Sequence, residues 1–204
     1  QHIVGIDTVR LFDIDPQATA KLVANLAGSG LQLEVCASTR EAVKGADIVT
    51  TVTADKQYAT IVSADMVEPG MHINAVGGDC PGKTELEAGV LSAGKVFVEY
   101  TPQSRIEGDI QQMPADFAVT ELWEVLAGQK SGRDSDAQIT VFDSVGFALE
   151  DFSALRFMFD AAMEAGLGER LALIPQMQDP KNLFGTLAGQ NAVHAAVLCE
   201  AVAA

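Results

Sequence analysis

The sequence predicts an α/β fold in which a doubly wound, mostly parallel sheet carries helices on both faces, followed by a C-terminal helical appendage. The first observation is the order of segments, because short apolar or β-branched runs alternate with segments of helical spacing. The second is that capping residues, prolines and glycines mark the boundaries between these segments. The third is size, since 204 residues with 48% hydrophobic content can bury a large core. Strands that alternate with helices form parallel sheets covered on both faces.

The first half of the chain alternates regularly. Strands are expected at residues 8–13, 31–36 and 47–53. A helix is expected at 17–27, because Asp15 supplies an N-cap, Pro16 suits the first helical turn, and glycines follow. Residues 38–41 have the form of a capping box, which predicts a short helix ending near residue 44.

The second half continues the pattern and then changes character. Strands are expected at 71–76, 95–99 and 138–142, and helices at 119–127 and 147–165. Thr84-Glu85-Leu86-Glu87 has capping-box form, which predicts a further helix. After Gly166, prolines interrupt short apolar pieces before an alanine-rich helix at 191–202. We interpret this last part as the appendage outside the sheet.

The charge of the chain argues against nucleic-acid and membrane partners. The 28 acidic and 13 basic residues give a formal charge of −15, which repels phosphate backbones and anionic lipid surfaces. No run approaches the roughly 20 apolar residues of a membrane span, and the start lacks the basic-then-apolar order of a signal peptide. The lack of both signals predicts a cytoplasmic protein. Cys36, Cys80 and Cys199 are widely spaced and odd in number, so we expect reduced thiols and no metal site.

The stretch from His72 to Leu86 carries the strongest chemical signal. An apolar strand ends in Gly77-Gly78, and two glycines let backbone approach a flat ligand closely. Pro81-Gly82 then bends the chain so that Lys83 can return towards Asp79. One carboxylate beside one ammonium suits redox chemistry on an amine. The alternative interpretation is a glycine-rich turn with a solvated ion pair.

Asp13 indicates a nucleotide. It is the last residue of the strand expected at 8–13. An acid at such a strand end accepts hydrogen bonds from the ribose hydroxyls of NAD, and its charge opposes the 2′-phosphate of NADP. Asp15 is the rival but suits an N-cap, and both could merely end a strand and cap a helix. The glycine fingerprint that accompanies this acid would lie about 20 residues earlier, upstream of Gln1. We therefore expect an incomplete Rossmann-like unit whose first βα element is missing.

The chain resembles the ornithine cyclodeaminase and mu-crystallin family over essentially its whole length. The segments that carry the resemblance are residues 41–55, the Gly-Gly-Asp-Cys-Pro-Gly-Lys-Thr-Glu-Leu block at 77–86, and residues 142–151. The block at 77–86 looks most like the ornithine cyclodeaminases within the family. The resemblance implies a Rossmann NAD-binding domain at 1–160 and a segment at 161–204 that returns to a substrate and dimerisation domain.

The resemblance also implies residue roles. Asp79 is the expected catalytic residue, which exchanges protons with the substrate amine. The expected cofactor contacts, together with Asp13, are Thr53, Val76, Gly77, Gly78, Asp79, Lys83 and Ser144. Asp79 and Val145 are expected to face the substrate.

Several of these residues have alternative interpretations. Thr53 could satisfy strand-end backbone, Ser144 could cap the helix at 147–165, Thr84 could cap another helix, and Lys83 could form a surface ion pair with Glu85. Four further residues are interpreted as packing residues: His72, Trp123, Phe157 and Phe159.

The activity implied by the resemblance is conversion of L-ornithine to L-proline and ammonia, with NAD consumed and regenerated within one cycle. A homodimer is implied for the complete protein, and little turnover is expected from this chain alone. Two alternatives stay open: a ketimine reductase or amino-acid dehydrogenase of the same family, or a catalytically silent NAD-binding protein.

Overall fold

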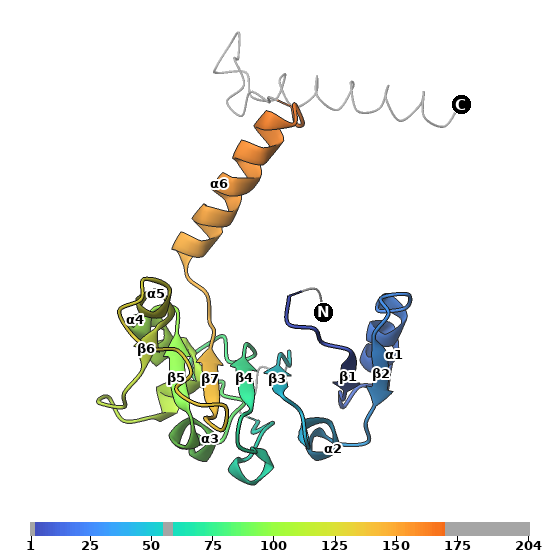
Figure 1. The fold of residues 1–204 in the computed structure, drawn as a ribbon, viewed down its shortest axis with the longest axis vertical. Coiled ribbons are helices and arrows are strands. Elements are labelled where there is room, and N and C mark those ends of the chain that lie inside the picture. The colour runs from blue at the N-terminus through green and yellow to red at the C-terminus, as the bar shows by residue number, and fades with distance from the viewer. Residues whose placement is uncertain (1–2, 55–58, 170–204) are drawn as a thin grey trace, which may run out of the picture. The chain divides into compact units, whose positions relative to one another are not determined.

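The computed structural model describes residues 3–54 and 59–169 (Figure 1). The chain divides into two compact units, Gln1–Ala154 and Leu155–Ala204. The helix expected at 191–202 lies outside the described residues, and the domain boundary at 160/161 stays a prediction. No helix in the part of the chain that the structure describes is long and apolar enough to cross a membrane.

Every strand pairing in the first unit is parallel, as predicted. One sheet joins β1 (Thr8–Leu11) to β2 (Gln32–Val35). The other has the order β3-β4-β7-β5-β6, with bounds Ile48–Thr51, His72–Ala75, Thr140–Asp143, Lys95–Val98 and Thr120–Glu121. Asp143 at the end of β7 is in register with both Ala75 and Val98. The carboxyl ends of the three central strands therefore lie at one edge.

The helices expected at 17–27, near 38–44 and at 147–165 are present, whereas the helix at 101–107 was not predicted. The α-helices are α1 (Pro16–Asn25), α2 (Thr39–Val43), α3 (Ala88–Ala93), α4 (Thr101–Glu107), α5 (Leu122–Leu126) and α6 (Ala148–Glu164). Two short 3₁₀ turns are η1 (Ala64–Met66) and η2 (Asp109–Gln112). Asp15 accepts from the Gln17 amide and Ser38 from the Glu41 amide, which confirms both predicted N-caps.

The helix predicted at the Thr84–Glu87 capping box is wrong. This segment is extended, Leu86 forms a parallel bridge with Val62, and α3 starts only at Ala88. The reason is tertiary, because the amides of Glu85 and Leu86 donate to the distant side chain of Asp109. Local capping chemistry is therefore overridden, and Thr84 caps no helix.

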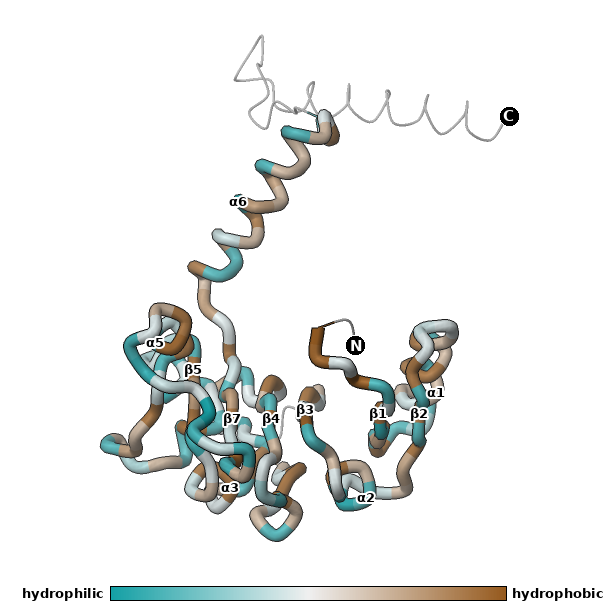
Figure 2. The backbone as a smooth tube through the Cα atoms, in the orientation of Figure 1, coloured by the Kyte–Doolittle hydropathy of each residue, from teal (hydrophilic) through white to brown (hydrophobic). Residues whose placement is uncertain are grey.

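The predictions at 119–127 and for three aromatic residues also need correction. Residues 120–121 form β6 beside β5 before α5 begins. Trp123, Phe157 and Phe159 are 51%, 71% and 61% exposed, so they are not core residues. Apolar and polar residues are interspersed along α6 (Figure 2). Helical periodicity alone does not say whether another element covers the apolar ones.

The core lies between the central strands and the segments that follow them. Ile73 of β4, Val98 of β5 and Val141 of β7 are fully buried. Val90 and Leu91 of α3 complete the same cluster. Burial of each such side chain contributes about 1.5–3 kcal/mol, which fixes the sheet edge on which the candidate site stands.

Candidate functional site

The predicted site residues follow strand ends. Thr53 lies just beyond β3, Val76 to Asp79 follow β4, and Ser144 and Val145 follow β7. These three strands are neighbours in the sheet, in the order β3-β4-β7. Open α/β sheets bind ligands outside the carboxyl ends of their strands. The structure therefore brings these residues to the edge where a ligand is expected.

Asp79 and Lys83 meet as the turn at Pro81-Gly82 predicts. The Nζ atom of Lys83 lies 3.5 Å from Oδ1 of Asp79 and donates to the carbonyl of Thr53 at 2.8 Å. Lys83 is only 3% exposed, whereas the Asp79 side chain is 65% exposed. The alternative of a surface ion pair between Lys83 and Glu85 is wrong, because the ammonium is buried and bound to Thr53. Asp79 is the member of the pair that a ligand can reach.

Glu85 is a buried member of the site that sequence reasoning missed. Its carboxylate is 1% exposed, and Oε1 accepts from both the amide (3.0 Å) and the hydroxyl of Thr53. This hydrogen bond orients the Thr53 hydroxyl. The backbone carbonyl of Thr53 accepts from the Lys83 ammonium. The Thr53 hydroxyl donates to a side-chain carboxylate and not to strand-end backbone, so the alternative interpretation is wrong. Its cofactor contact stays a prediction.

The glycine pair has an internal explanation. A Cβ atom on Gly77 would overlap the carboxylate of Glu85, and one on Gly78 would lie 3.0 Å from Oδ2 of Asp109. Both glycines are buried, while Val76 before them and Asp79 after them are exposed. Two buried carboxylates therefore account for the lack of side chains at 77 and 78. Contact of either glycine with a cofactor stays a prediction.

Two further buried carboxylates, those of Asp109 and Asp143, accept hydrogen bonds from backbone amides near the site. Oδ1 of Asp109 accepts from the amides of Glu85 (2.9 Å) and Leu86 (2.8 Å), and Asp143 accepts from the amides of Asp109 (2.8 Å) and Ile110 (2.9 Å). Burial raises the pKa of Asp109 to about 6 and that of Asp143 to about 7, against the lowering effect of these amides. The carboxylates of Asp143 and Asp109 thus connect the end of β7, through η2, to the backbone of Glu85 and Leu86.

Ser144 is held by another acid beyond a strand end. Its hydroxyl donates to Oε1 of Glu99 at 2.5 Å, and the Val145 amide donates to Oε2 at 3.2 Å. Since α6 begins only at Ala148, Ser144 does not cap this helix. Glu99 directly follows β5, a position like that of Asp13 after β1. That shared position is the signal by which Glu99 could have been found.

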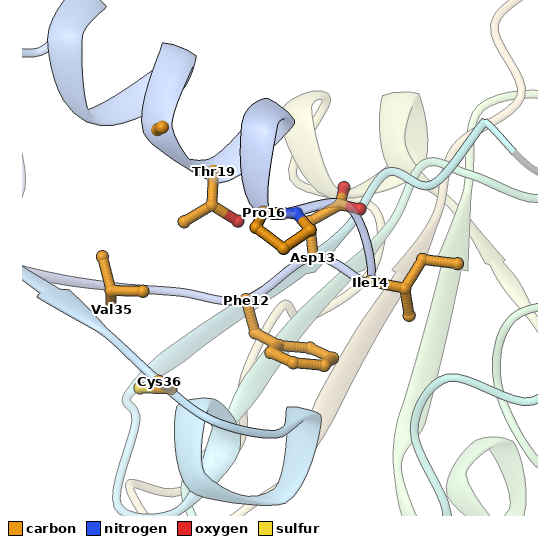
Figure 3. Close-up of a pocket in the computed structure, with 8 residues that line it drawn as sticks. Phe12, Asp13, Ile14, Pro16, Thr19, Val35 and Cys36 are labelled. Atoms are coloured by element: carbon orange, nitrogen blue, oxygen red, sulfur yellow. The ribbon is translucent and has the colours of Figure 1, made fainter.

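Asp13 lies in a separate, exposed setting. Its Oδ1 accepts from the Asp15 amide at 2.7 Å, and its residue is exposed. It lines a cavity of about 490 Å³ (Figure 3). The lining residues are Phe12, Asp13, Ile14, Pro16, Thr19, Ala20, Val35 and Cys36. An exposed carboxylate beside an apolar hollow has the chemistry to accept ribose hydroxyls while apolar groups hold a planar base.

His72 is half-buried rather than a core residue, and it lies at the start of β4, at the end opposite the candidate site. Nδ1 is 2.8 Å from the Thr140 hydroxyl and Nε2 is 3.1 Å from Oδ1 of Asn74. Burial lowers the pKa of this imidazole. Both ring nitrogens therefore have protein partners. Neither partner belongs to the candidate site residues that follow β4.

Comparison with known proteins agrees with this geometry. The model of the ornithine cyclodeaminase/mu-crystallin family matches residues 1–166. An ornithine cyclodeaminase of Brucella suis is 57% identical over 185 residues, which cover 91% of this chain and 52% of that protein. The chain thus spans about half the length of the curated relatives it matches.

Solved structures give the same result for the fold. A lysine cyclodeaminase structure that describes recognition of L-lysine, L-ornithine and L-2,4-diaminobutyric acid matches with a TM-score of 0.76 and 30% identity, over 87% of this chain and 52% of that one. An archaeal alanine dehydrogenase dimer with bound NAD matches with a TM-score of 0.75 and 30% identity, over 85% and 55%. The parallel sheets are therefore Rossmann-like, and this chain belongs to the ornithine cyclodeaminase/mu-crystallin family.

Proposed function

We propose that the protein containing this chain is an NAD-dependent ornithine cyclodeaminase that converts L-ornithine to L-proline and ammonia. The observation that carries the proposal is the 57% identity to the Brucella suis enzyme across 91% of the chain. The Asp79 and Lys83 pair beyond β4 supports it with suitable chemistry. The alanine dehydrogenase relatives are more distant, at 30% identity.

The residues present fit NAD. The exposed carboxylate of Asp13 has one oxygen engaged by the Asp15 amide and can accept ribose hydroxyls with the other. Its charge repels a 2′-phosphate, which favours NAD over NADP. When bound, NAD supplies a hydride acceptor that becomes the donor later in the cycle. Val76 and Asp79, which are exposed after β4, would contact the nicotinamide end of the cofactor.

Asp79 performs the proton transfers in this proposal. Its side chain is 65% exposed, so a substrate amine can reach its carboxylate. The carboxylate would accept a proton from the substrate α-amine and would later return a proton to the amine nitrogen of the product. Lys83, fixed by the Thr53 carbonyl, lies beside Oδ1 and holds the carboxylate in place. Val145, whose amide is fixed by Glu99, is proposed to contact the substrate.

The proposal also covers assembly and location. We expect a homodimer, and the alanine dehydrogenase relative supports this because its structure is a dimer. A cytoplasmic location is supported by the two cysteines of the described residues, Cys36 and Cys80, which are both free thiols.

The test uses the full-length protein with L-ornithine and a catalytic amount of NAD. We expect proline and ammonia in equal amounts without net formation of NADH. Asp79→Asn should lower this turnover by about a hundredfold or more, because proton transfer contributes on the order of 10²–10⁴-fold, while NAD binding measured by fluorescence titration persists. Retention of more than a tenth of the turnover would rule out the role of Asp79. Net NADH formed from an amino acid would instead identify a dehydrogenase.

A further inference from the structure

The loop from Cys80 to Leu86 is bound by side chains of η2. Oε1 of Gln111 accepts from the Gly82 amide at 2.6 Å, and Nε2 donates to the carbonyls of Lys83 (2.9 Å) and Cys80 (3.3 Å). Oδ1 of Asp109 accepts from the amides of Glu85 and Leu86, and Gln112 donates to the Leu86 carbonyl at 2.9 Å. We call the side chains of Asp109, Gln111 and Gln112 the η2 clamp.

The clamp is itself fixed to the centre of the sheet. Both carboxylate oxygens of Asp143, the last residue of β7, accept amides from the start of η2. Gly108 approaches Asp143 so closely that a Cβ would lie 2.5 Å from Oδ2. Asp109 and Asp143 are both fully buried. The position of the Lys83 backbone is therefore determined by β7 through two sets of hydrogen bonds. Asp143 binds the start of η2, and Gln111 of η2 binds the Lys83 carbonyl.

Asp109 and Gln111 make their polar contacts to backbone groups. Asp109 is buried beneath Gly78 and uses Oδ1 entirely for backbone amides. The Gln111 amide group is engaged on both its oxygen and its nitrogen by backbone. Among the described residues, the polar contacts of the clamp thus determine the backbone path of the Cys80–Leu86 loop.

We propose that Asp109 and Gln111 are positioning residues, which hold the Cys80–Leu86 loop so that Lys83 and Asp79 face one another at the sheet edge. This inference rests on the proposed function. Reacting groups misplaced by about 1 Å can lose about a hundredfold in rate. Loss of the clamp should therefore lower turnover without removing any group that touches the substrate.

The test compares four variants of the full-length protein. Asp109→Ala removes both amide contacts, whereas Asp109→Asn retains an oxygen that can accept them. Gln111→Met keeps length and removes the donor and the acceptor. Gln103→Met is the matched control, because Gln103 donates to the Glu107 carboxylate on α4 and does not contact the loop.

The expected results separate positioning from general stability. Asp109→Ala and Gln111→Met should lower kcat for proline formation by about a hundredfold, with the Kd for NAD changed less than about threefold. Asp109→Asn should stay within about fivefold of the wild-type kcat, because both hydrogen bonds remain. Amide hydrogen exchange should become faster at Glu85 and Leu86 in Asp109→Ala, and at Gly82 in Gln111→Met. Gln103→Met should match the wild type in all readouts.

Contrary results are distinct from failure of the proposed function. Wild-type kcat in both Asp109→Ala and Gln111→Met, or equal loss in Asp109→Asn and Asp109→Ala, would overturn the positioning role. If Asp109→Ala does not fold, Gln111→Met decides alone. If the wild-type protein does not convert ornithine, the proposed function fails. Unchanged amide exchange in the variants would still reject the clamp in that case.

Discussion

Acids follow strand ends in two regions of this molecule, and they differ in what they bind. In the five-stranded sheet, Asp143 is the last residue of β7, accepts backbone amides and is fully buried, as is Asp109 of η2, whose amide it accepts. Beyond β1, Asp13 is exposed, and among the described residues it accepts only the local amide of Asp15. A buried carboxylate with amide partners determines the paths of loops, whereas an exposed carboxylate with a free oxygen is available to a ligand.

Asp79 combines features of both regions. It stands on a loop held by buried acids, yet its own side chain is exposed. That combination gives a fixed backbone and an accessible carboxylate, which is what a proton-transferring group requires. The two regions therefore differ in the role of their acids. Buried acids, here called supporting acids, hold loop backbone, whereas exposed acids are available to bind a ligand.

The largest effect is expected from Gly77→Ala. The new methyl group would overlap the Glu85 carboxylate, which cannot move without losing its bonds to Thr53. Overpacking and an unsatisfied buried group together should lower the free energy of unfolding by about 3 kcal/mol or more. Urea denaturation of the full-length protein measures it.

Gly132→Ala is the matched control for this substitution. A Cβ there would meet Cγ1 of Val125 at 3.6 Å, an ordinary contact. Its unfolding free energy should therefore stay near that of the wild type. Equal stability of Gly77→Ala and Gly132→Ala would show that the buried carboxylate does not constrain the glycine pair.

A pH-dependent effect is expected from Asp109→Asn. Burial raises the pKa of Asp109 from 3.8 to about 6, so the folded protein binds more protons than the unfolded chain between these values. Stability contributed by the protonated form is consequently lost as the pH rises from about 4 to about 6. The negative charge of Glu85 also raises the pKa of Asp109, whereas the positive charge of Lys83 lowers it.

Asparagine removes the titration and keeps an acceptor for both amides. Relative to the wild type, the variant should gain about 2–3 kcal/mol of unfolding free energy between pH 4 and pH 7. Urea denaturation at both pH values measures this difference. A constant difference at the two pH values would mean that Asp109 titrates as an ordinary exposed acid, and the contrast with Asp13 would not hold.

A smaller effect on affinity is expected from Asp13→Asn. Loss of a charged acceptor for the ribose hydroxyls should weaken NAD binding by about tenfold. Removal of the negative charge should also narrow the difference in affinity between NAD and NADP. Calorimetric titration of the full-length protein with each nucleotide checks both expectations. Unchanged Kd values for both would assign Asp13 to the local turn alone.

The sequence predicts much of this architecture, and it fails where distant contacts decide. The β-branched run before Thr53 marks β3, and Pro81-Gly82 correctly brings Lys83 to Asp79. The Thr84 capping box fails because its amides bind Asp109, which lies 24 residues from Glu85 along the chain. Burial of a carboxylate depends on such tertiary partners, so local spacing cannot separate supporting acids from exposed ones.

The smallest effect tests whether Asp13 and Asp15 have separate roles. Asp15 caps α1 through the Gln17 amide, and its own backbone amide, rather than its side chain, binds Asp13. Asp15→Ala should therefore cost about 1 kcal/mol of unfolding free energy and leave the Kd for NAD unchanged, as thermal unfolding and the same titration would measure. Asp15→Asn, which can still cap the helix, is the control and should restore the stability. A weakened Kd in Asp15→Ala with normal affinity in Asp13→Asn would reverse the two assignments and make Asp15 the ribose-binding acid.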